Sequence, residues 1–413
     1  MATVVLVGTL DTKGREYAFL ADRVREHGLE VILVDAGIVG EPLATPDVTR
    51  EEVAAAVGAD VAALAAAGDR GAAVETMSRG AAEIVKRLHA EGRLDAVGGL
   101  GGSGGSALVT YAMRQLPIGV PKLMVSTVAS GDTGPYVGSV DVTMMYSVVD
   151  IAGVNEVSAR IMANAAGALA GMAQATVPDL GVKRPIVVAS MFGVTTAAVT
   201  VARERLEELG YEVLVFHQTG AGGGSMEKLL EAGFAVGSLD VTTTEFCDLV
   251  AGGVLAAVPE RLESAGKAGI PQVVSLGALD MVNFGPMDSV PERYRDRNLY
   301  VHNPTITLMR TTPDECREIA RIVAGKLNAA ESNTVLYVPL RGVSAIATEG
   351  QVFHDAEADE ALFSTLRELV DTSKVEVHEL ELDVNAPEFA LAMANRLHEL
   401  IGGQGGGGDD VGA

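Results

Sequence analysis

The sequence of 413 residues has no tryptophan, only two cysteines and 4% aromatic residues. Cys247 and Cys316 stand far apart and form no metal-binding spacing, so we expect free thiols in a reducing, cytoplasmic compartment. The N-terminal segment MATVVLVGTL lacks a basic stretch and reads as a first strand rather than a signal peptide. No apolar run reaches the roughly 20 residues of a membrane span, so no membrane partner is expected.

Basic residues are also scarce. The chain has 31 Lys and Arg against 55 Asp and Glu, which gives a formal net charge of −24. Nucleic acids and anionic membrane surfaces attract proteins with a surplus of Lys and Arg. The charge therefore argues against both as main partners and leaves a small-molecule ligand or another protein chain.

What the sequence does contain is a regular alternation of short β-branched runs with helical patterns. Strands are predicted at 3–9, 30–37, 95–101 and 121–129, separated by helices that include one near 49–66. Such alternation predicts βαβ units around parallel sheets that are buried on both faces. The fold class is therefore α/β.

The pattern pauses near residues 178–184 and then begins a new cycle, which predicts two doubly wound, Rossmann-like domains with mainly parallel sheets. The first domain would occupy 1–180 and the second 184–402. The second has its own glycine-rich loop, QTGAGGGS, followed by a helix with Ser225 as its N-cap. The glycine-rich end, 403–413, is expected to be a disordered tail.

A glycine cluster stands between the third strand and the next helix. Six of the eight residues from Gly98 to Gly105 are glycine. At the carboxyl edge of a parallel sheet, exposed backbone amides and the positive end of a helix dipole suit a phosphate group. A tightly packed or flexible strand–helix connection is the alternative, since the cluster matches neither common phosphate-binding pattern.

The first strand ends in GTLDTKG, at the same predicted sheet edge. Lys13 would neutralise a phosphate and Thr12 would donate a hydrogen bond, unless Lys13 is simply a solvated lysine. Asp11 would either hold Mg²⁺ through water or cap the helix. Arg70, at the start of a helix, is unfavourable for the dipole unless an anion joins it, and that anion is either a ligand or the neighbouring Asp69.

The second strand ends near Asp35, Gly37 and Ile38, where a nucleoside would lie beside the first turn.

Several motifs in this order resemble the Tm-type ATP-binding domain family: GTLDTKG, GLGGSGGS, PIGVPKLMVSTVASGDTGPYVG, SVVDIAGVN, HQTGAGGGSME and GALDMVNFG. The family includes the N-terminal half of the tomato mosaic virus resistance protein and many bacterial proteins. The resemblance implies two Rossmann-like subdomains, ATP bound in the first, and a homodimer. It implies nucleotide contacts at Asp11, Thr12, Lys13, Gly37, Ile38, Arg70, Gly101, Gly102, Ser103, Gly104 and Gly105. A threonine of the plant protein corresponds to Ile38, so a hydroxyl contact is not carried over.

The second half holds the groups with catalytic potential. His217 ends a predicted strand, and Glu227 stands in the first turn of the helix that follows. Asp280 and His302 come from the segments GALDMVNFGP and YVHNPTITLMR, and together the four residues would bind a metal or supply an acid–base pair in an interdomain cleft. Alternatively, the histidines only satisfy backbone groups at strand ends.

Three hypotheses remain open. The chain is an ATP-binding protein, an enzyme (a metal-assisted hydrolase, lyase or isomerase) acting on a small acidic metabolite, or a nucleotide-regulated interaction protein.

Overall fold

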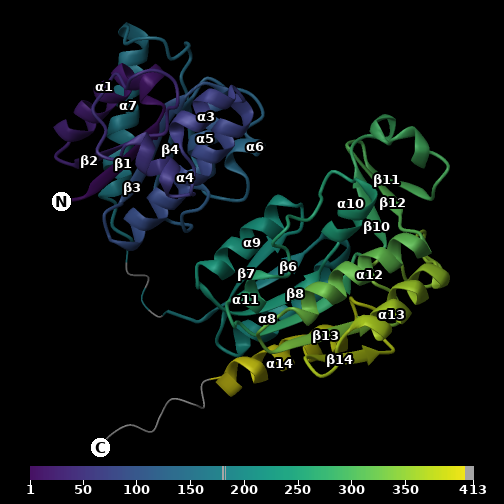
Figure 1. Ribbon diagram of the computed structural model, residues 1–413. Coiled ribbons are helices and arrows are strands. Elements are labelled where there is room, and N and C mark those ends of the chain that lie inside the picture. The colour runs from purple at the N-terminus through teal and green to yellow at the C-terminus, as the bar shows by residue number, and fades with distance from the viewer. Residues whose placement is uncertain (179–180, 182, 405–413) are drawn as a thin grey trace, which may run out of the picture. The chain divides into compact units, whose positions relative to one another are not determined.

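The computed structural model describes residues 1–178, 181 and 183–404. The chain divides into two compact units, Met1–Asp179 and Leu180–Ala413. Each unit contains a parallel β-sheet covered by helices (Figure 1), so the α/β, doubly wound prediction is confirmed. No helix in the described ranges is long and apolar enough to cross a bilayer.

The sheet of the first unit has five parallel strands in the order β2-β1-β3-β4-β5. The strands are β1 (Thr3–Gly8), β2 (Glu30–Asp35), β3 (Ala96–Gly101), β4 (Lys122–Ser126) and β5 (Thr143–Tyr146). The helices are α1 (Leu10–Glu26), α2 (Arg50–Ala55), α3 (Val61–Ala67), α4 (Arg70–Ala90), α5 (Ser103–Met113), α6 (Gly134–Val137) and α7 (Glu156–Ala173).

Helices cover both faces of this sheet because successive strand side chains point to opposite sides. Val4 and Leu6 pack with α1 and α7, whereas Val5 and Val7 pack with α4 and α5. All four side chains are fully buried. Both faces of β1 are therefore core, as its uninterrupted apolar run predicts.

Strands β1 and β3 separate before they end. They pair from Val4 with Ala96 to Leu6 with Gly98. Beyond that pair, the buried hydroxyl of Tyr17 from α1 donates to the carbonyl oxygen of Val7 at 2.6 Å and accepts from the Leu100 N–H at 2.8 Å. The phenol thus takes the place of the next ladder bonds and holds the two strand ends apart as a fork, which we call the β1/β3 fork.

Burial raises the pKa of the Tyr17 hydroxyl, which therefore stays protonated and able to donate. Gly8 makes room for the ring, since a Cβ there would lie 2.1 Å from the Tyr17 hydroxyl oxygen.

The second unit has a six-stranded parallel sheet, in the order β14-β13-β9-β8-β6-β7, and a separate antiparallel sheet, β10-β12-β11. Its strands are β6 (Ile186–Met191), β7 (Glu212–His217), β8 (Ala235–Thr242), β9 (Gln272–Gly277), β10 (Met281–Phe284), β11 (Leu299–Asn303), β12 (Ile306–Arg310), β13 (Thr334–Pro339) and β14 (Val375–Leu380). Its α-helices are α8 (Thr196–Glu208), α9 (Ala221–Glu231), α10 (Glu245–Ala251), α11 (Ser264–Lys267), α12 (Pro313–Asn328), α13 (Ala356–Leu369) and α14 (Pro387–Gln404), with short 3-10 turns at Gly193–Thr195, Met287–Ser289 and Glu292–Tyr294.

Some local predictions are wrong. The single helix expected near 49–66 is two helices, α2 and α3, because Asp60 caps a new helix by accepting from the Ala63 N–H at 2.8 Å. The predicted tail begins inside α14, which continues to Gln404; the rest of that prediction, 405–413, lies outside the described residues.

The second glycine-rich loop is not the counterpart of the first. The first follows β3, the third strand of its unit, whereas the second follows β7, the second strand of its unit. Most of it is helical, because α9 begins at Ala221, so Ser225 lies inside that helix and is not its N-cap. The two glycine-rich segments therefore occupy different places in the strand order of their units.

The Tyr17 hydroxyl yields the first testable prediction. Tyr17→Phe leaves the Val7 carbonyl and the Leu100 N–H without their buried partner, so the free energy of unfolding should fall by about 1–3 kcal/mol. Urea unfolding followed by circular dichroism measures the change. In Tyr111→Phe, where the hydroxyl makes no hydrogen bond among the described residues, the change should stay within about 0.5 kcal/mol. Equal effects of the two variants would contradict the role of the Tyr17 hydroxyl.

Candidate functional site

The β1/β3 fork is the point at which the strand order of the first unit reverses. From β1 the chain goes to β2 on one side and returns to β3 on the other. Ligands of open α/β sheets bind at the carboxyl ends of the strands at such a point. The turn with Asp11, Thr12 and Lys13 follows β1, and Gly101 to Gly105 follow β3, so the structure brings these two predicted segments to one sheet edge.

Packing explains only half of the glycine cluster. At three of the glycines, an added Cβ would meet neighbouring atoms at 3.0 Å or less: Gly98 beside Leu169, Gly99 beside Val109 and Val7, and Gly101 beside the Cα of Gly105. At Gly102, Gly104 and Gly105 the nearest atom would be 3.7 Å away, which is an ordinary contact. The fold therefore needs the first three glycines, whereas the last three have room for a Cβ, so close packing does not require glycine there.

These uncovered glycines form the start of α5. Gly102 is its N-cap residue, and no side chain caps the first turn. The first amides of a helix have no partner inside the helix, and they carry the positive end of its dipole. The first turn of α5 consists of Ser103, Gly104 and Gly105, all at least partly accessible, so it offers an anion both donors and close approach.

Arg70 lies beside this turn. A methyl group on Gly104 would be 3.7 Å from the Arg70 Nη2. Arg70 is exposed, forms no ion pair with any described carboxylate and occupies the first position of α4. The neighbouring Asp69 is used as the helix cap, accepting from the Ala72 N–H at 3.0 Å. An unpaired cation at a helix N-terminus opposes the dipole, so its place next to the glycines favours a bound anion.

Asp11 does not take the expected capping position. Thr9, not Asp11, is the N-cap residue of α1. The Asp11 carboxylate instead accepts from the N–H groups of Ile38 at 3.0 Å and Val39 at 2.7 Å. It thereby ties the loop after β2 to the first turn, and Gly37 is required because a Cβ there would lie 2.6 Å from the Asp11 Cγ. Ile38 takes part in this contact through its backbone N–H group and not through its side chain.

Lys13 is not a free, solvated lysine. Its ammonium donates to the carbonyl oxygen of Ile151, in the loop between β5 and α7, and the side chain is half-buried. The backbone at Lys13 leaves the helical region, with φ of −126° and ψ of 16°. Thr12 is exposed, with its hydroxyl oxygen 2.9 Å from that of Thr9.

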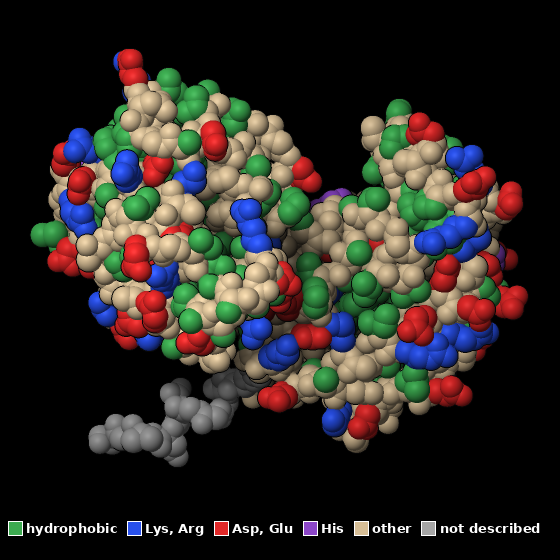
Figure 2. Space-filling model, turned by 45° about the horizontal axis from the view of Figure 1, so that its top comes forward, with side chains coloured by type: hydrophobic (Ala, Val, Ile, Leu, Met, Phe, Trp, Pro, Cys, Tyr) green, Lys and Arg blue, Asp and Glu red, His purple; other side chains and the backbone are tan. Residues whose placement is uncertain are grey.

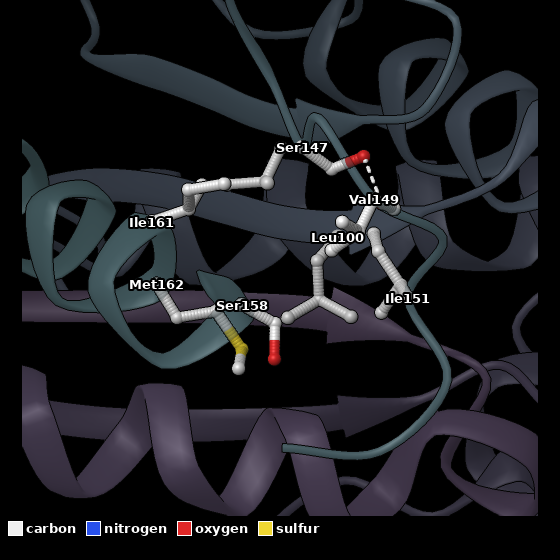
Figure 3. A pocket seen from close by; sticks show the side chains of 8 residues that line it. Leu100, Ser147, Val149, Ile151, Ser158, Ile161 and Met162 are labelled. Atoms are coloured by element: carbon white, nitrogen blue, oxygen red, sulfur yellow. Dashed lines mark hydrogen bonds between the residues drawn. The ribbon is translucent and has the colours of Figure 1, made fainter. Parts of the chain in front are cut away.

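The loop that Lys13 holds, residues 147–153, is strained. Val148 has a φ of 63° and is 60% exposed, an unusual conformation for a β-branched residue. The Ser147 hydroxyl donates to the Val149 carbonyl oxygen at 2.7 Å (Figure 3), and the Gly153 N–H donates to the Glu16 carboxylate. The cavity under this loop, between Leu100 and α7, measures only about 10 Å³, enough for at most one water molecule.

Asp35 completes this edge of the sheet at the end of β2. The side chain is 1% exposed, and its Oδ1 accepts from the N–H groups of Leu10 and Gly37 at 3.0 and 2.9 Å. Its Oδ2 is buried and has no partner among the described atoms. Burial, with a smaller contribution from the charge of Asp11, raises the pKa of Asp35.

In the second unit, Glu227 has a structural partner. It is 2% exposed, lies in the middle of α9 and pairs with Arg261 at 3.3 Å. It also accepts from the N–H groups of Leu262 and Ser264 at 2.7 and 2.9 Å. Its predicted place in the first turn of a helix is therefore wrong, and its oxygens are fully engaged.

Arg261 is the centre of a buried charge cluster. It is 0% exposed and contacts Asp240 and Glu245 as well as Glu227. Glu245 in turn accepts from the Gly220 N–H at 2.8 Å, just before α9. Through this hydrogen bond, the charge cluster holds the start of the second glycine-rich segment in place. The segment therefore has a structural role.

The other three catalytic candidates have separate surroundings. His217 is exposed and stacks on Phe192, and His302 lies exposed on β11 beside Tyr300. Asp280 is fully buried, and its Oδ2 accepts from the Ser344 hydroxyl at 2.8 Å. Each candidate thus has partners that the others do not share. Within the described ranges, no three His, Cys, Asp or Glu side chains are placed to hold a metal ion.

The chain was also compared with known proteins. Residues 2–178 match the N-terminal domain, and residues 184–401 the C-terminal domain, of an uncharacterised protein family designated UPF0261. The chain belongs to the UPF0261 family.

A UPF0261 protein of Clostridium tetani is 53% identical over 96% of this chain and 98% of its own length. The tomato mosaic virus (ToMV) resistance protein Tm-1(GCR237) of Solanum lycopersicum is 38% identical over 96% of this chain and 55% of its own length. Among solved structures, MurG of Acinetobacter baumannii aligns with 98% of this chain and 93% of its own at 12% identity and a TM-score of 0.22, which carries no argument about function.

Two buried carboxyl groups in the second unit of this UPF0261 chain have raised pKa values. Burial raises the pKa of Asp248 to about 7 and that of Asp280 to about 6. Asp248 lies on α10 and accepts from the backbone and side-chain N–H groups of Asn283 at 2.6 and 2.8 Å. The Asn283 Oδ1 is buried without a partner among the described atoms, so a flipped amide would accept from a protonated Asp248.

Sequence reasoning missed Tyr17, Glu16 and Arg261. Tyr17 and Glu16 stand in a helical pattern where an apolar ring and a charged residue are ordinary. Arg261 follows a segment without periodicity. Each of these residues is marked by a hydrogen-bond or ion-pair partner far away in the sequence. A single sequence contains no pattern that reveals such a partner.

A pair of glycine substitutions tests the division of the cluster. Gly104→Ala should leave the free energy of unfolding unchanged or raise it by up to about 1 kcal/mol, because alanine is the better helix former and has room. Gly101→Ala should lower it by about 1–3 kcal/mol, because the methyl group would press on Gly105. Urea unfolding of both variants measures the difference. If Gly104→Ala is the more damaging, the division is wrong.

The Asp248 carboxyl predicts a pH dependence of stability. Its pKa is higher in the folded chain, at about 7, than the ordinary 3.8, so the folded state binds the proton more tightly. Its contribution is complete below pH 3.8 and is lost as pH rises towards about 7. Unfolding by urea at pH 5 and pH 8 should show a smaller loss in Asp248→Asn than in the unmodified chain. An identical loss would show that Asp248 is not the group that titrates.

Proposed function

We propose that the first unit binds ATP at the β1/β3 fork, with the phosphates on the first turn of α5 between Gly102 and Gly105. The observation that carries the proposal is a coincidence of three features. Three glycines have no packing reason, they open an uncapped helix, and the unpaired Arg70 lies beside them. Each feature alone has another explanation, but together they describe an anion site.

The neighbouring residues supply the rest of the proposed nucleotide contacts. Arg70 would donate to phosphate oxygens from one side, and Lys13, whose ammonium group has three N–H donors and uses one on the Ile151 carbonyl, would supply a second positive charge. The buried Asp11 Oδ1, which has no partner among the described atoms, is available to Mg²⁺ or to a water molecule on it. The equally unpartnered Asp35 Oδ2 would accept from a ribose hydroxyl.

The choice of ATP rather than another nucleotide rests on the resemblance to the Tm-type ATP-binding domains, as does a homodimeric state. The tomato relative is a ToMV resistance protein, but the match covers 55% of its length. We do not extend its role to this chain. On the face shown in Figure 2, acidic and basic side chains are interspersed, in keeping with a chain whose expected partners exclude nucleic acid.

The alternative of an enzyme acting on a small acidic metabolite is less well supported. It required His217, Glu227, Asp280 and His302 to act on one ligand. The ion pair of Glu227 with Arg261 and the separate partners of the other three residues provide no common site inside the second unit. We therefore propose nucleotide binding without assigning a reaction.

The proposal is tested by calorimetric titration of the full chain with ATP in the presence of Mg²⁺. Arg70→Ala should weaken binding by about ten- to a hundredfold, because a hydrogen bond to a charged group contributes about 1.5–3 kcal/mol. Gly104→Ala should weaken it as well, since its methyl group points towards Arg70. Lys13→Ala is a less clean test, because it also frees the loop at Ile151.

Arg79→Ala is the matched control. Arg79 is exposed on the same helix, α4, and forms no ion pair among the described residues. It should leave ATP affinity unchanged. If Arg70→Ala and Gly104→Ala both bind ATP as the unmodified chain does, the phosphate site is not on α5.

A further inference from the structure

The loop after β4, TVASGDT (127–133), belongs to the same sheet edge as the proposed nucleotide site. Strand β4 ends at Ser126, which pairs with Gly101 at the end of β3, and α5 lies beside β4 (Figure 1). A Cβ on Gly102 would lie 3.7 Å from the Oγ1 of Thr127, the first residue of the loop. The loop therefore brings a side-chain hydroxyl to the N-cap position of α5.

The Thr127 side chain has no partner, whereas its backbone is fixed. Its hydroxyl makes no hydrogen bond with any described residue, and the side chain is half-buried. The Thr127 N–H donates to the Gly101 carbonyl oxygen at 3.2 Å. The hydroxyl oxygens of the preceding Ser126 and of Ser106 on α5 lie 2.6 Å apart, and both side chains are fully buried. These bonds join the loop to the start of α5, so Thr127 is held beside the first turn before any ligand binds.

Thr127 and Arg70 border different glycines of this turn. A Cβ on Gly104 would lie 3.7 Å from the Arg70 Nη2, the same distance that separates a Cβ on Gly102 from the Thr127 Oγ1. The space that these two glycines leave open is therefore bordered by two groups with free N–H or O–H donors. Both donors would face an anion that binds to the first amides of α5.

The other helix at the β1/β3 fork does not offer such a turn. The Leu10 N–H, at the start of α1, donates to the Asp35 carboxylate at 3.0 Å. Asp11 adds a negative charge to the same turn, whereas the first turn of α5 contains no acidic residue. An anion is favoured where the positive end of a helix dipole is not already compensated. We therefore expect the phosphates on α5, where Thr127 lies, and not on α1.

We propose that the Thr127 hydroxyl is a further phosphate-binding group, which donates to a phosphate oxygen beside Gly102 while Arg70 donates beside Gly104. This role rests on the proposed nucleotide binding at the β1/β3 fork. A phosphate oxygen about 2.7 Å from the Oγ1 would have ordinary hydrogen-bond geometry. The bond is strengthened by the charge of the phosphate, and no side chain on Gly102 stands in its way.

The test is calorimetric titration of the full chain with ATP and Mg²⁺. Thr127→Val replaces the hydroxyl with a methyl group and should weaken ATP binding about three- to thirtyfold. Because the hydroxyl has no partner within the described chain, the urea unfolding midpoint without ATP should not change. Thr127→Ser keeps the hydroxyl and should restore most of the affinity.

Thr143→Val is the matched control. Thr143 is exposed at the start of β5, at the opposite edge of the same parallel sheet, and its hydroxyl has no partner among the described residues. This variant loses the same chemical group and should bind ATP as the unmodified chain does.

The possible failures can be told apart. If Thr127→Val binds ATP normally while Arg70→Ala does not, the role of Thr127 is overturned and the nucleotide site on α5 stands. An equal loss of affinity in Thr127→Ser and Thr127→Val, or a lowered unfolding midpoint in Thr127→Val, would also overturn it, because the hydroxyl would then not act on the ligand. If the unmodified chain does not bind ATP, both proposals are wrong.

Discussion

The hydroxyl of Tyr17 is the interaction on which the first unit's proposed site depends. Two adjacent parallel strands would normally continue their ladder to the end, and the loops after them would then be pressed together. A single buried phenol, bonded to both strands, takes over where the ladder stops, before either strand has ended. The resulting gap separates the turn after β1 from the glycines after β3. The same ring requires Gly8, because a Cβ at that position would clash with it. The glycine in the strand and the tyrosine in the helix therefore depend on each other.

The glycine cluster shows how a sequence signal can be correct and still mix two causes. The cluster predicts close backbone approach, and that expectation applies to all six residues. In the structure, Gly98, Gly99 and Gly101 allow strand, helix and side chains to pack closely, whereas at Gly102, Gly104 and Gly105 an added Cβ would make only an ordinary contact at 3.7 Å. Only the positions of neighbouring atoms separate these causes. The alternation of strands and helices could be predicted without the positions of neighbouring atoms, because the period of apolar residues is a local property of the sequence.

In the second unit, the local sequence patterns suggested a catalytic site whose residues do not share partners in the structure. Glu227 near a glycine-rich segment and two histidines at or near strand ends suggested chemistry. The fold instead assigns Glu227 to a buried arginine 34 residues further along the chain, together with two other carboxylates. An arginine without water around it requires such partners, and removing one would leave an uncompensated buried charge. Sequence alone cannot distinguish a carboxylate kept for a ligand from one kept for a buried cation, because both are acidic residues beside a loop.

The bond between Lys13 and the Ile151 carbonyl has a consequence for how the molecule responds to its surroundings. An ammonium group has three N–H donors, so Lys13 can hold that carbonyl and still donate to the anion proposed at the fork. The bond to Ile151 then fixes where the ammonium group lies, so that occupancy of the fork and the fastening of residues 147–153 would be linked equilibria, with a linkage that acts equally in both directions. A partner that prefers the loop fastened would tighten anion binding, and a partner that prefers it released would weaken it. The exposed Val148, held at a positive φ, lies in the segment of the surface that such a partner would contact.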